Sequence, residues 1–350
     1  MNYHGGDIYK YDKEIIDFSS NINPFGVPQS LKVSLMDNLE VFSRYPDISY
    51  KKVRDAIAKY LCIGDINHIV VGNGAVEIIY KVVSASNVNE IIIPCPTFSE
   101  YKRAAKVNNK PYKEIVAFRE DGSLNLNSIY ENITSNSLMV LCNPNNPTGT
   151  LLDPALITSL AQRLKEKESW LLVDESFIEF SQQYPLTSVV PKLIQHPNII
   201  VIRAATKFFG IPGVRLGYGV VGDSRLAASV KEKMEPWSVN SLAELAGLQV
   251  FKDKQYIAKS RLWVEEERKY LFNQLKLIKG VAVVPSEANF LLLKSKKLTA
   301  FQIKENLLKK KILIRVPQGF TGLTKYHFRV AVKDREANQQ LIKALKEVLM

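Results

Sequence analysis

The chain is organised around the segment Ala204-Ala205-Thr206-Lys207-Phe208-Phe209-Gly210-Ile211-Pro212-Gly213-Val214-Arg215-Leu216-Gly217-Tyr218. Its lysine, Lys207, follows the apolar run 199–202, which predicts a buried strand. A turn rich in glycine and aromatic residues then leads to Arg215. A lysine at a strand end, among apolar groups, can lose its proton, and the neutral amine can form a Schiff base with an aldehyde. An ordinary surface lysine is the alternative, since the chain contains many.

Short apolar runs alternate with helical patterns before this segment. The runs that predict buried strands are residues 69–71, 91–93, 138–142 and 170–173. Continuous apolar strands that alternate with helices indicate a mostly parallel sheet covered on both faces. We therefore expect an α/β fold in which ligands bind at the carboxyl ends of the strands.

The pattern changes near residue 225. A long helical pattern rich in Lys and Glu covers residues 241–275, and short strands then alternate with two helices. This arrangement is typical of a smaller α+β domain joined to a larger one by a long helix. We expect three parts, which are an N-terminal arm near the active site (1–28), a large domain (29–225) and a small C-terminal domain (226–350).

Composition and charge narrow the classes of function. The 350 residues are 46% hydrophobic and 23% charged, as in an ordinary globular protein, and carry a net charge of +12. The densest basic runs lack interleaved aromatic residues and no recognised nucleic-acid-binding module accompanies them, so we expect no nucleic-acid partner. No apolar run approaches the roughly 20 residues that span a bilayer, so we expect no membrane partner. Three cysteines and four histidines are scattered, which predicts reduced thiols and no metal site. No secretory signal is visible, so we expect a cytoplasmic protein.

Polar residues follow the predicted strands at the edge where ligands bind. The turn 72–75, Gly-Asn-Gly-Ala, joins a strand to a helix, where small residues let backbone N–H groups approach a phosphate. A plain tight turn is the alternative. Asp174 ends an apolar strand, and a buried carboxylate there needs a partner such as a protonated ring nitrogen, unless it only caps a helix. Asn146, in an Asn-Pro-Thr-Gly turn, can donate to a phenolate oxygen or simply form the turn.

Three further residues have both a functional and a structural interpretation. Phe98 can stack on a ring, or it can belong to the core. Arg215 and Arg329 flank apolar runs. A buried arginine suits a bidentate anion, although a structural salt bridge is its more usual role.

The joint order of these residues points to a family. Three motifs occur in the order found in fold-type I enzymes that use pyridoxal 5'-phosphate: Asn-Pro-Asn-Asn-Pro-Thr-Gly at 143–149, Val-Asp-Glu-Ser-Phe at 173–177, and residues 204–218. The chain resembles the aminotransferase class of these enzymes, which includes histidinol-phosphate aminotransferase, over nearly its whole length. The resemblance implies an α/β fold-type I architecture whose large domain binds pyridoxal 5'-phosphate.

The resemblance also implies roles for the cofactor-binding residues. Lys207 would bind the cofactor covalently, and Asp174 would pair with the pyridine nitrogen. Asn146 would bond the ring hydroxyl, and Phe98 would stack on the ring. The residues implied to hold the cofactor phosphate are Gly74, Ala75, Arg215 and Thr206.

Two more matches concern the substrate and the partner subunit. Arg329, in Phe-Arg-Val-Ala, matches the arginine that grips the substrate carboxylate. Tyr45, in Arg-Tyr-Pro-Asp, matches the tyrosine that reaches the cofactor phosphate of the neighbouring subunit, which implies a homodimer with shared active sites. Two positions depart from the pattern. Ala204 stands where many relatives have serine or threonine, so one phosphate contact is missing or replaced. Phe177 replaces a tyrosine, so the ring oxygen loses a donor.

The arm distinguishes two reactions. His4-Gly5-Gly6 and residues 17–26, together with Phe177, resemble the threonine-phosphate decarboxylases of cobalamin biosynthesis. Histidinol-phosphate aminotransferases of histidine biosynthesis more often have Asn-Glu-Asn-Pro in the arm. We predict decarboxylation of L-threonine O-3-phosphate to aminopropanol phosphate. The alternative is transfer of an amino group between histidinol phosphate and 2-oxoglutarate. A non-catalytic ligand sensor is a third interpretation, for which no DNA-binding segment is visible.

Both candidate substrates carry a phosphate, which suits a basic chain. Arg315, in Ile-Arg-Val-Pro, is our candidate for gripping the substrate phosphate or carboxylate. His4 and Asn23 are further candidates for this substrate site, although His4 can equally belong to a disordered terminus.

Overall fold

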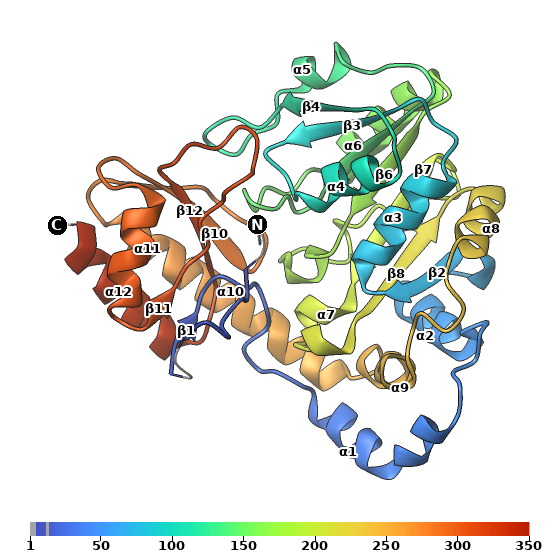
Figure 1. Cartoon of the computed structure of the whole chain (residues 1–350), viewed down its shortest axis with the longest axis horizontal. Helices are drawn as coiled ribbons and strands as arrows, with labels where there is room; N and C mark the ends of the chain where they lie inside the picture. Colours follow the sequence, from blue (N-terminus) through green and yellow to red (C-terminus); the bar gives the residue numbers. More distant parts are fainter. Residues whose placement is uncertain (1–4, 12–13, 350) are drawn as a thin grey trace.

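The computed structural model describes residues 5–11 and 14–349. Figure 1 shows two lobes, of which the larger contains the main sheet and the smaller contains the C-terminus. The helices and strands are, in order, β1 (Ile16–Asp17), α1 (Gln29–Asp37), α2 (Lys51–Leu61), β2 (Ile69–Asn73), α3 (Ala75–Ala85), β3 (Glu90–Cys95), α4 (Glu100–Val107), β4 (Tyr112–Val116), α5 (Leu126–Tyr130), β5 (Ser137–Cys142), α6 (Pro154–Lys165), β6 (Trp170–Asp174), β7 (Ile199–Ala204), α7 (Ala205–Phe208), β8 (Leu216–Val221), α8 (Ser224–Glu232), α9 (Ser241–Val250), α10 (Lys254–Lys276), β9 (Val281–Val283), β10 (Phe290–Ser295), α11 (Ala300–Leu308), β11 (Ile312–Leu313), β12 (His327–Ala331) and α12 (Arg335–Leu349).

The main sheet has seven strands in the order β2-β8-β7-β6-β5-β3-β4. Strand β8 runs antiparallel to both of its neighbours, and the remaining neighbours pair in parallel. The central strands β5 and β7 are buried along their whole length, as their continuous apolar runs predict. The expected α/β fold with a mostly parallel sheet is confirmed.

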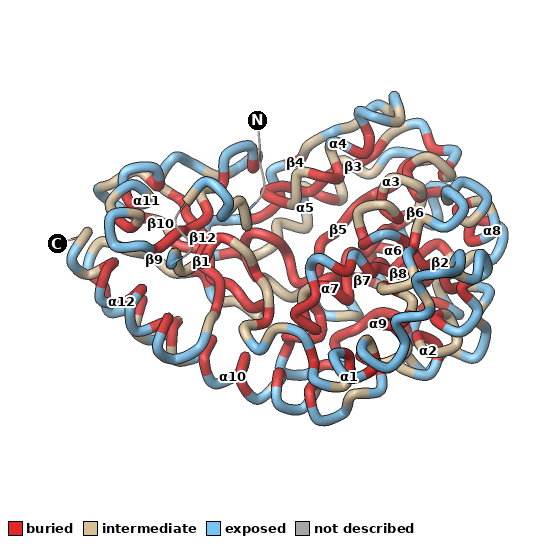
Figure 2. The backbone as a smooth tube through the Cα atoms, turned by 60° about the horizontal axis from the view of Figure 1, so that its bottom comes forward, coloured by how far each residue is buried: buried red, intermediate tan, exposed pale blue. Residues whose placement is uncertain are grey.

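Helices cover both faces of this sheet. Helices α3, α4 and α8 contribute buried residues to one apolar cluster with the strands. Helix α6 contributes to a second cluster on the other face. Figure 2 shows the buried strands of this sheet and, around them, helices that alternate between buried and more exposed residues. Because helices cover both faces, the carboxyl ends of β5, β6 and β7 form the edge of the sheet at which the following loops can present polar groups.

The smaller lobe contains the antiparallel sheet β12-β10-β9. Helix α12 packs on α10 and α11, α10 packs on β9 of this sheet, and α11 packs on β11. Buried residues of all three helices belong to one apolar cluster that continues into the larger lobe. Strand β1 of the arm pairs in parallel with β11, so the arm is attached to the smaller lobe. The domain boundaries at residues 28 and 225 stay a prediction; the strands of the main sheet lie within 69–221 and those of the smaller sheet within 281–331.

The long helical pattern at 241–275 is the clearest error in the predicted elements. It is two helices, α9 and α10, and the chain breaks between them. Asp253 caps α10 by accepting a hydrogen bond from the backbone N–H of Tyr256. An N-cap carboxylate satisfies a backbone donor that an uninterrupted helix would bond internally, so it starts a new helix.

None of the helices in the described ranges has the length and hydropathy needed to cross a bilayer.

Candidate active site

A cavity of about 400 Å³ lies where the arm, the carboxyl edge of the main sheet and β12 meet. Its walls come from segments far apart in the sequence, including residues 19–21 of the arm. The predicted site residues that line it are Ala75, Phe98, Asn146, Asp174, Thr206, Lys207, Arg215 and Arg329. Residues predicted from the sequence as site residues are thus brought together around this cavity.

Lys207 lies in the single turn of α7, directly after β7. Its side chain is partly buried, and its Nζ forms no hydrogen bond or ion pair with any residue that the structure describes. Burial, together with the positive charges of Arg329 and Arg215 and against the opposing effect of Asp174, lowers the pKa of this amine from 10.5 to about 8. Roughly a tenth of Lys207 is therefore neutral at pH 7, far more than for an ordinary lysine, and this neutral amine is available as a nucleophile.

Asp174 ends β6 and is buried beside the cavity. One carboxylate oxygen accepts a hydrogen bond from the Tyr101 hydroxyl at 2.7 Å, and the other accepts one from the Ser176 backbone N–H at 3.0 Å. Desolvation raises the pKa of Asp174, so a cation arriving in the cavity would stabilise its charged form.

Tyr101 is a residue that we missed in the sequence. It lies in α4, is fully buried, and contacts Phe98 edge to face at a centroid distance of 5.7 Å. An aromatic residue inside a helix is usually a core residue, and no sequence signal indicates that its hydroxyl meets a carboxylate 73 positions away. Tyr101 connects the carboxylate of Asp174 with the aromatic wall of the cavity.

The turn before α3 has room for the side chain of Arg215 to lie close to the backbone. Gly74 has φ +79°, and a Cβ there would lie 2.5 Å from the guanidinium of Arg215. A Cβ on Gly217 in β8 would lie 2.1 Å from the backbone nitrogen of Ala75. Both glycines therefore allow Arg215 and the first N–H groups of α3 to lie together, which is a suitable arrangement for an anion.

Arg329 lies in β12 and is buried. Its Nη1 donates to the side-chain oxygen of Asn146, and its Nη2 donates to the backbone carbonyl of Ser19 at 3.1 Å. The side-chain oxygen of Asn21 accepts from the same guanidinium at 3.1 Å in the amide orientation that satisfies both groups. The Nε of Arg329 is buried without a hydrogen-bond acceptor among the described residues. Burial lowers the pKa of Arg329 to about 9, so an anion in the cavity would be strongly favoured.

The contact with Arg329 also orients Asn146. Because the amide oxygen is engaged, the Nδ2 group is the part of Asn146 left for a ligand, and it donates to no other described residue. This orientation suits an acceptor such as a ring oxygen.

Asn23 does not reach the cavity. It is buried, its Nδ2 donates to Phe208 and Ser260, and its Oδ1 accepts from the backbone N–H of Phe25. These contacts use the whole amide, so the structure does not support Asn23 as a substrate ligand. Asn21, two residues earlier, is the asparagine of the arm that lines the cavity. The sequence contained no feature that distinguished the two.

Arg315 is not among the residues that line the cavity, but it is paired with Arg329, which does line it. The two residues form an antiparallel bridge, with backbone hydrogen bonds of 3.0 and 2.9 Å, so their side chains share a face. Burial lowers the pKa of Arg315 to about 10, and its positive charge contributes to the lowered pKa of Arg329. Neither guanidinium forms an ion pair with a carboxylate of the described chain.

The remaining residues singled out in the sequence are Tyr45, His4 and Phe177, of which Phe177 lines the cavity. Tyr45 is exposed and contacts Trp237 at a ring-centroid distance of 4.8 Å, away from the cavity lining. His4 lies outside the described residues. Phe177 lines the cavity and contacts Phe290 edge to face, and the guanidinium of Arg329 lies over the same Phe290 ring.

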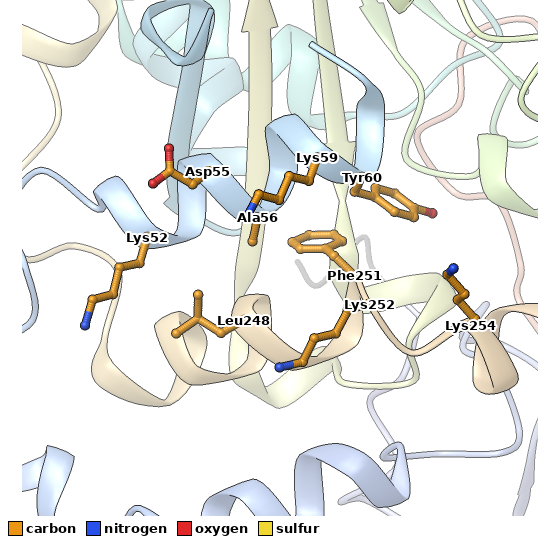
Figure 3. Close-up of a pocket in the computed structure, with 9 residues that line it drawn as sticks. All are labelled: Lys52, Asp55, Ala56, Lys59, Tyr60, Leu248, Phe251, Lys252 and Lys254. Atoms are coloured by element: carbon orange, nitrogen blue, oxygen red, sulfur yellow. The ribbon is translucent and has the colours of Figure 1, made fainter. Parts of the chain in front are cut away.

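A second hollow, of about 520 Å³, lies between α2 and the connection of α9 to α10 (Figure 3). Four lysines surround it, with Ala56, Leu248 and Phe251 on its apolar side. Surface lysines around an apolar floor indicate no particular ligand. We therefore assign the chemistry to the first cavity.

The first cavity fits a phosphorylated pyridine aldehyde. Lys207 supplies a free amine, Asp174 a desolvated carboxylate, and Arg215 with the start of α3 an anion cradle. Residues 13–345 match the family described as aminotransferase class I and II. The chain therefore belongs to this family, and its cofactor is pyridoxal 5'-phosphate. The resemblance expected from the motifs is confirmed.

Individual relatives extend this result. The chain is 41% identical to "Putative threonine-phosphate decarboxylase" of Caldanaerobacter subterraneus, over 98% of this chain and 93% of the relative. It is 35% identical to the threonine-phosphate decarboxylase of Salmonella typhimurium, over 99% and 96%. Among solved structures, the histidinol-phosphate aminotransferase of Clostridium acetobutylicum superposes with a TM-score of 0.89 at 35% identity, covering 95% of this chain and 98% of that one.

Proposed function

We propose that this protein is a pyridoxal-phosphate-dependent decarboxylase of L-threonine O-3-phosphate, with aminopropanol phosphate and carbon dioxide as products. The observation that carries this proposal is its 41% and 35% identity, over nearly the full chain, to two relatives named for this activity. The methanogen histidinol-phosphate aminotransferase of Methanocaldococcus jannaschii is 30% identical. The cavity adds a chemical reason, because the buried guanidinium of Arg329 lines it and Arg315, also buried, is paired with Arg329, which suits a substrate with two anionic groups.

The cofactor, when bound, withdraws electrons from the substrate Cα, and the protein selects the bond that breaks. Lys207 would hold the aldehyde carbon of the cofactor and would move protons at Cα. Asp174 would keep the ring nitrogen protonated, and Asn146 would donate to the ring oxygen. Phe98 would stack on the ring. The residues that would hold the phosphate are Gly74, Ala75, Thr206 and Arg215.

The buried arginines decide where the substrate lies. Arg329, fixed by Asn146 and Ser19, is the partner for one anionic group. Arg315, whose side chain shares its face, is the partner for the other. The placing of the substrate carboxylate by these arginines would decide whether it is the group that leaves. Two separately placed guanidiniums can hold the phosphate at one end and set the carboxylate at the other.

Replacing Arg315 by methionine should weaken binding of the phosphorylated substrate. Loss of one partner from a buried charge contact weakens the free energy of binding by about 2 kcal/mol or more. We therefore expect KM for L-threonine O-3-phosphate to rise at least about 30-fold. Steady-state kinetics with L-threonine as a matched substrate provide the control. If Arg315 binds the phosphate, the variant should lose its preference for the phosphorylated compound. An unchanged preference would assign Arg315 to another role.

Histidinol-phosphate aminotransferase is the second candidate. The observation in its favour is the 35% identity and the TM-score of 0.89 to the Clostridium acetobutylicum structure of that name. Histidinol phosphate has a phosphate but no carboxylate. The second substrate, 2-oxoglutarate, would then use the arginine that holds the carboxylate. Product analysis distinguishes the two reactions directly.

We also propose a homodimer. A strip of large apolar side chains is exposed along α1 and the chain that follows it: Val33, Met36, Leu39, Phe42 and Ile48. Exposed apolar patches of this kind are typical of association surfaces. Tyr45 lies in the same strip and is held by Trp237, so a second subunit docked there would receive it.

Sedimentation should give a mass of about twice 39.6 kDa. Phe42→Asp places a charge in the proposed contact and should shift the protein to the monomer mass and weaken cofactor binding, because the tyrosine of the other subunit is lost. Ile194→Asp is a matched change at an exposed apolar residue outside the strip, and it should leave the mass and the cofactor affinity unchanged. A monomeric wild-type protein would contradict the proposal.

The cytoplasmic location is a further part of the proposal. Cys62, Cys95 and Cys142 are all free thiols. Reduced cysteines are usual in the cytoplasm and unusual in secreted proteins.

A further inference from the structure

A four-residue segment of the arm, residues 23–26, lies between the turn that carries Lys207 and helix α10. On one side, the backbone of Gly26 packs against Gly210, where a Cβ would lie 2.5 Å from the Gly26 carbonyl oxygen. On the other side, the Tyr256 hydroxyl of α10 donates to the same Gly26 carbonyl at 2.8 Å. The segment therefore contacts both elements at once.

Asn23 makes the polar contacts of this segment with the lysine turn. Its backbone N–H donates to the carbonyl of Lys207 at 3.2 Å. Its Nδ2 donates to the carbonyl of Phe208 at 2.8 Å and to the hydroxyl of Ser260 in α10, also at 2.8 Å. Asn23 is 1% exposed and Ser260 is fully buried, so water does not compete for these hydrogen bonds.

Phe25 anchors the same segment on α10. Its ring meets Tyr256 and Trp263 edge to face, at centroid distances of 6.4 and 5.8 Å, and Lys259 lies over it at 4.2 Å. Aromatic and cation–π contacts of this kind are each worth roughly 0.5–1.5 kcal/mol. These contacts hold the arm on helix α10, and Asn23 links this part of the arm to the backbone of the lysine turn.

We propose that Asn23 is a positioning residue for Lys207, which ties the backbone of the lysine turn to helix α10 and so fixes the amine in the cavity. The proposal rests on the proposed function only in taking Lys207 as the reactive amine. It replaces the expectation that Asn23 binds substrate.

The position of the Lys207 amine determines its reactivity, because burial and the neighbouring charges set its pKa. Its Nζ faces Arg329 on β12, Arg215 before β8 and Asp174 at the end of β6. Desolvation is the largest cause of its lowered pKa. If the turn loosens, the amine gains water and its pKa rises toward the ordinary value, so fewer molecules are reactive at neutral pH.

The test measures Lys207 in the cofactor-free full chain. The protein is treated with acetaldehyde and cyanoborohydride at a series of pH values, and alkylation of Lys207 is followed by peptide mass spectrometry. In the wild type, the rate should rise with a midpoint near pH 8. In Asn23→Ala, we expect a midpoint about one pH unit higher and about tenfold slower alkylation at pH 7.

Two further variants make the result interpretable. Asn198→Ala is the matched control, since Asn198 is also buried and donates to two carbonyls, but lies before the opposite end of β7. It should leave the midpoint unchanged. Ser260→Ala removes the α10 side of the link and should shift the midpoint in the same direction as Asn23→Ala, even if the latter folds poorly.

Coincident profiles for the wild type, Asn23→Ala and Ser260→Ala would overturn the proposal. The proposed function would remain intact in that case, because Lys207 would still show its low midpoint. A wild-type Lys207 that is no more reactive than surface lysines would instead overturn the assignment of Lys207, and the proposed function with it.

Discussion

Replacement of Lys207 by methionine is expected to abolish turnover and, at the same time, to stabilise the cofactor-free protein. In the proposed function Lys207 is both the covalent anchor of the cofactor and the group that moves protons at the reacting carbon, and the substitution would remove both. Each such contribution is typically worth about a hundred- to ten-thousandfold in rate. The cofactor should also become removable by dialysis, because no covalent bond retains it.

The gain in stability follows from the pKa of Lys207. Folding lowers it from 10.5 to about 8, so the charged amine is less favourable in the folded chain than in the unfolded one. At about 1.4 kcal/mol for each tenfold change in ionisation, this sets an upper limit of about 3 kcal/mol. Below pH 8 the amine is charged in both states and the full cost is present. Between pH 8 and 10.5 the folded chain releases its proton first, and above 10.5 the cost disappears.

Denaturant unfolding of the two cofactor-free proteins at pH 7 and at pH 10.5 measures this effect. Methionine retains most of the apolar stem, so little packing is lost. We expect the variant to be more stable at pH 7 and the difference to shrink at the higher pH. A variant that is less stable than the wild type at pH 7 would show that Lys207 is not held in a desolvated position.

Asp174→Asn is expected to lower kcat about a hundred- to a thousandfold, because the preorganised charge that we propose to face the cofactor ring nitrogen is lost. The shape of the side chain is retained, and an asparagine oxygen can still accept from the Ser176 N–H. Since desolvation raises the pKa of Asp174, the carboxylate costs stability in the cofactor-free chain above that pKa. The variant should therefore be more stable than the wild type at neutral pH.

Tyr101→Phe provides the accompanying control. In the wild-type background, loss of the hydroxyl that donates to Asp174 should reduce kcat about tenfold, the order expected for a hydrogen bond to a charged group. In the Asp174→Asn background the same change should have little further effect, because the two residues act as a unit. Additive losses in kcat would show that Tyr101 acts independently of Asp174.

The sequence predicted the candidate site best where a polar residue comes at or soon after the end of a predicted strand. Asp174, Asn146 and Lys207 each follow a continuous apolar run, and parallel strands bring their carboxyl ends to one edge. The fold class and the family could be predicted for that reason. The individual roles of these residues stay predictions, which the variants above would test.

Residues whose role depends on tertiary contacts could not be predicted. Tyr101 is an aromatic residue in a helix, and only folding brings its hydroxyl to Asp174. Asn21 and Asn23 lie in the same irregular segment, which has no periodicity to show which side chain faces the cavity. In the same way, the break between α9 and α10 depends on a single capping residue, Asp253, within a continuous helical pattern.

The most direct test of the central claim is product analysis with the two candidate substrates. Purified protein loaded with pyridoxal 5'-phosphate is incubated with L-threonine O-3-phosphate, and released carbon dioxide and aminopropanol phosphate are measured. A parallel sample receives histidinol phosphate with 2-oxoglutarate, and glutamate is measured. We predict carbon dioxide and aminopropanol phosphate in equal amounts in the first sample and no glutamate in the second. Glutamate without carbon dioxide would contradict the account and identify an aminotransferase.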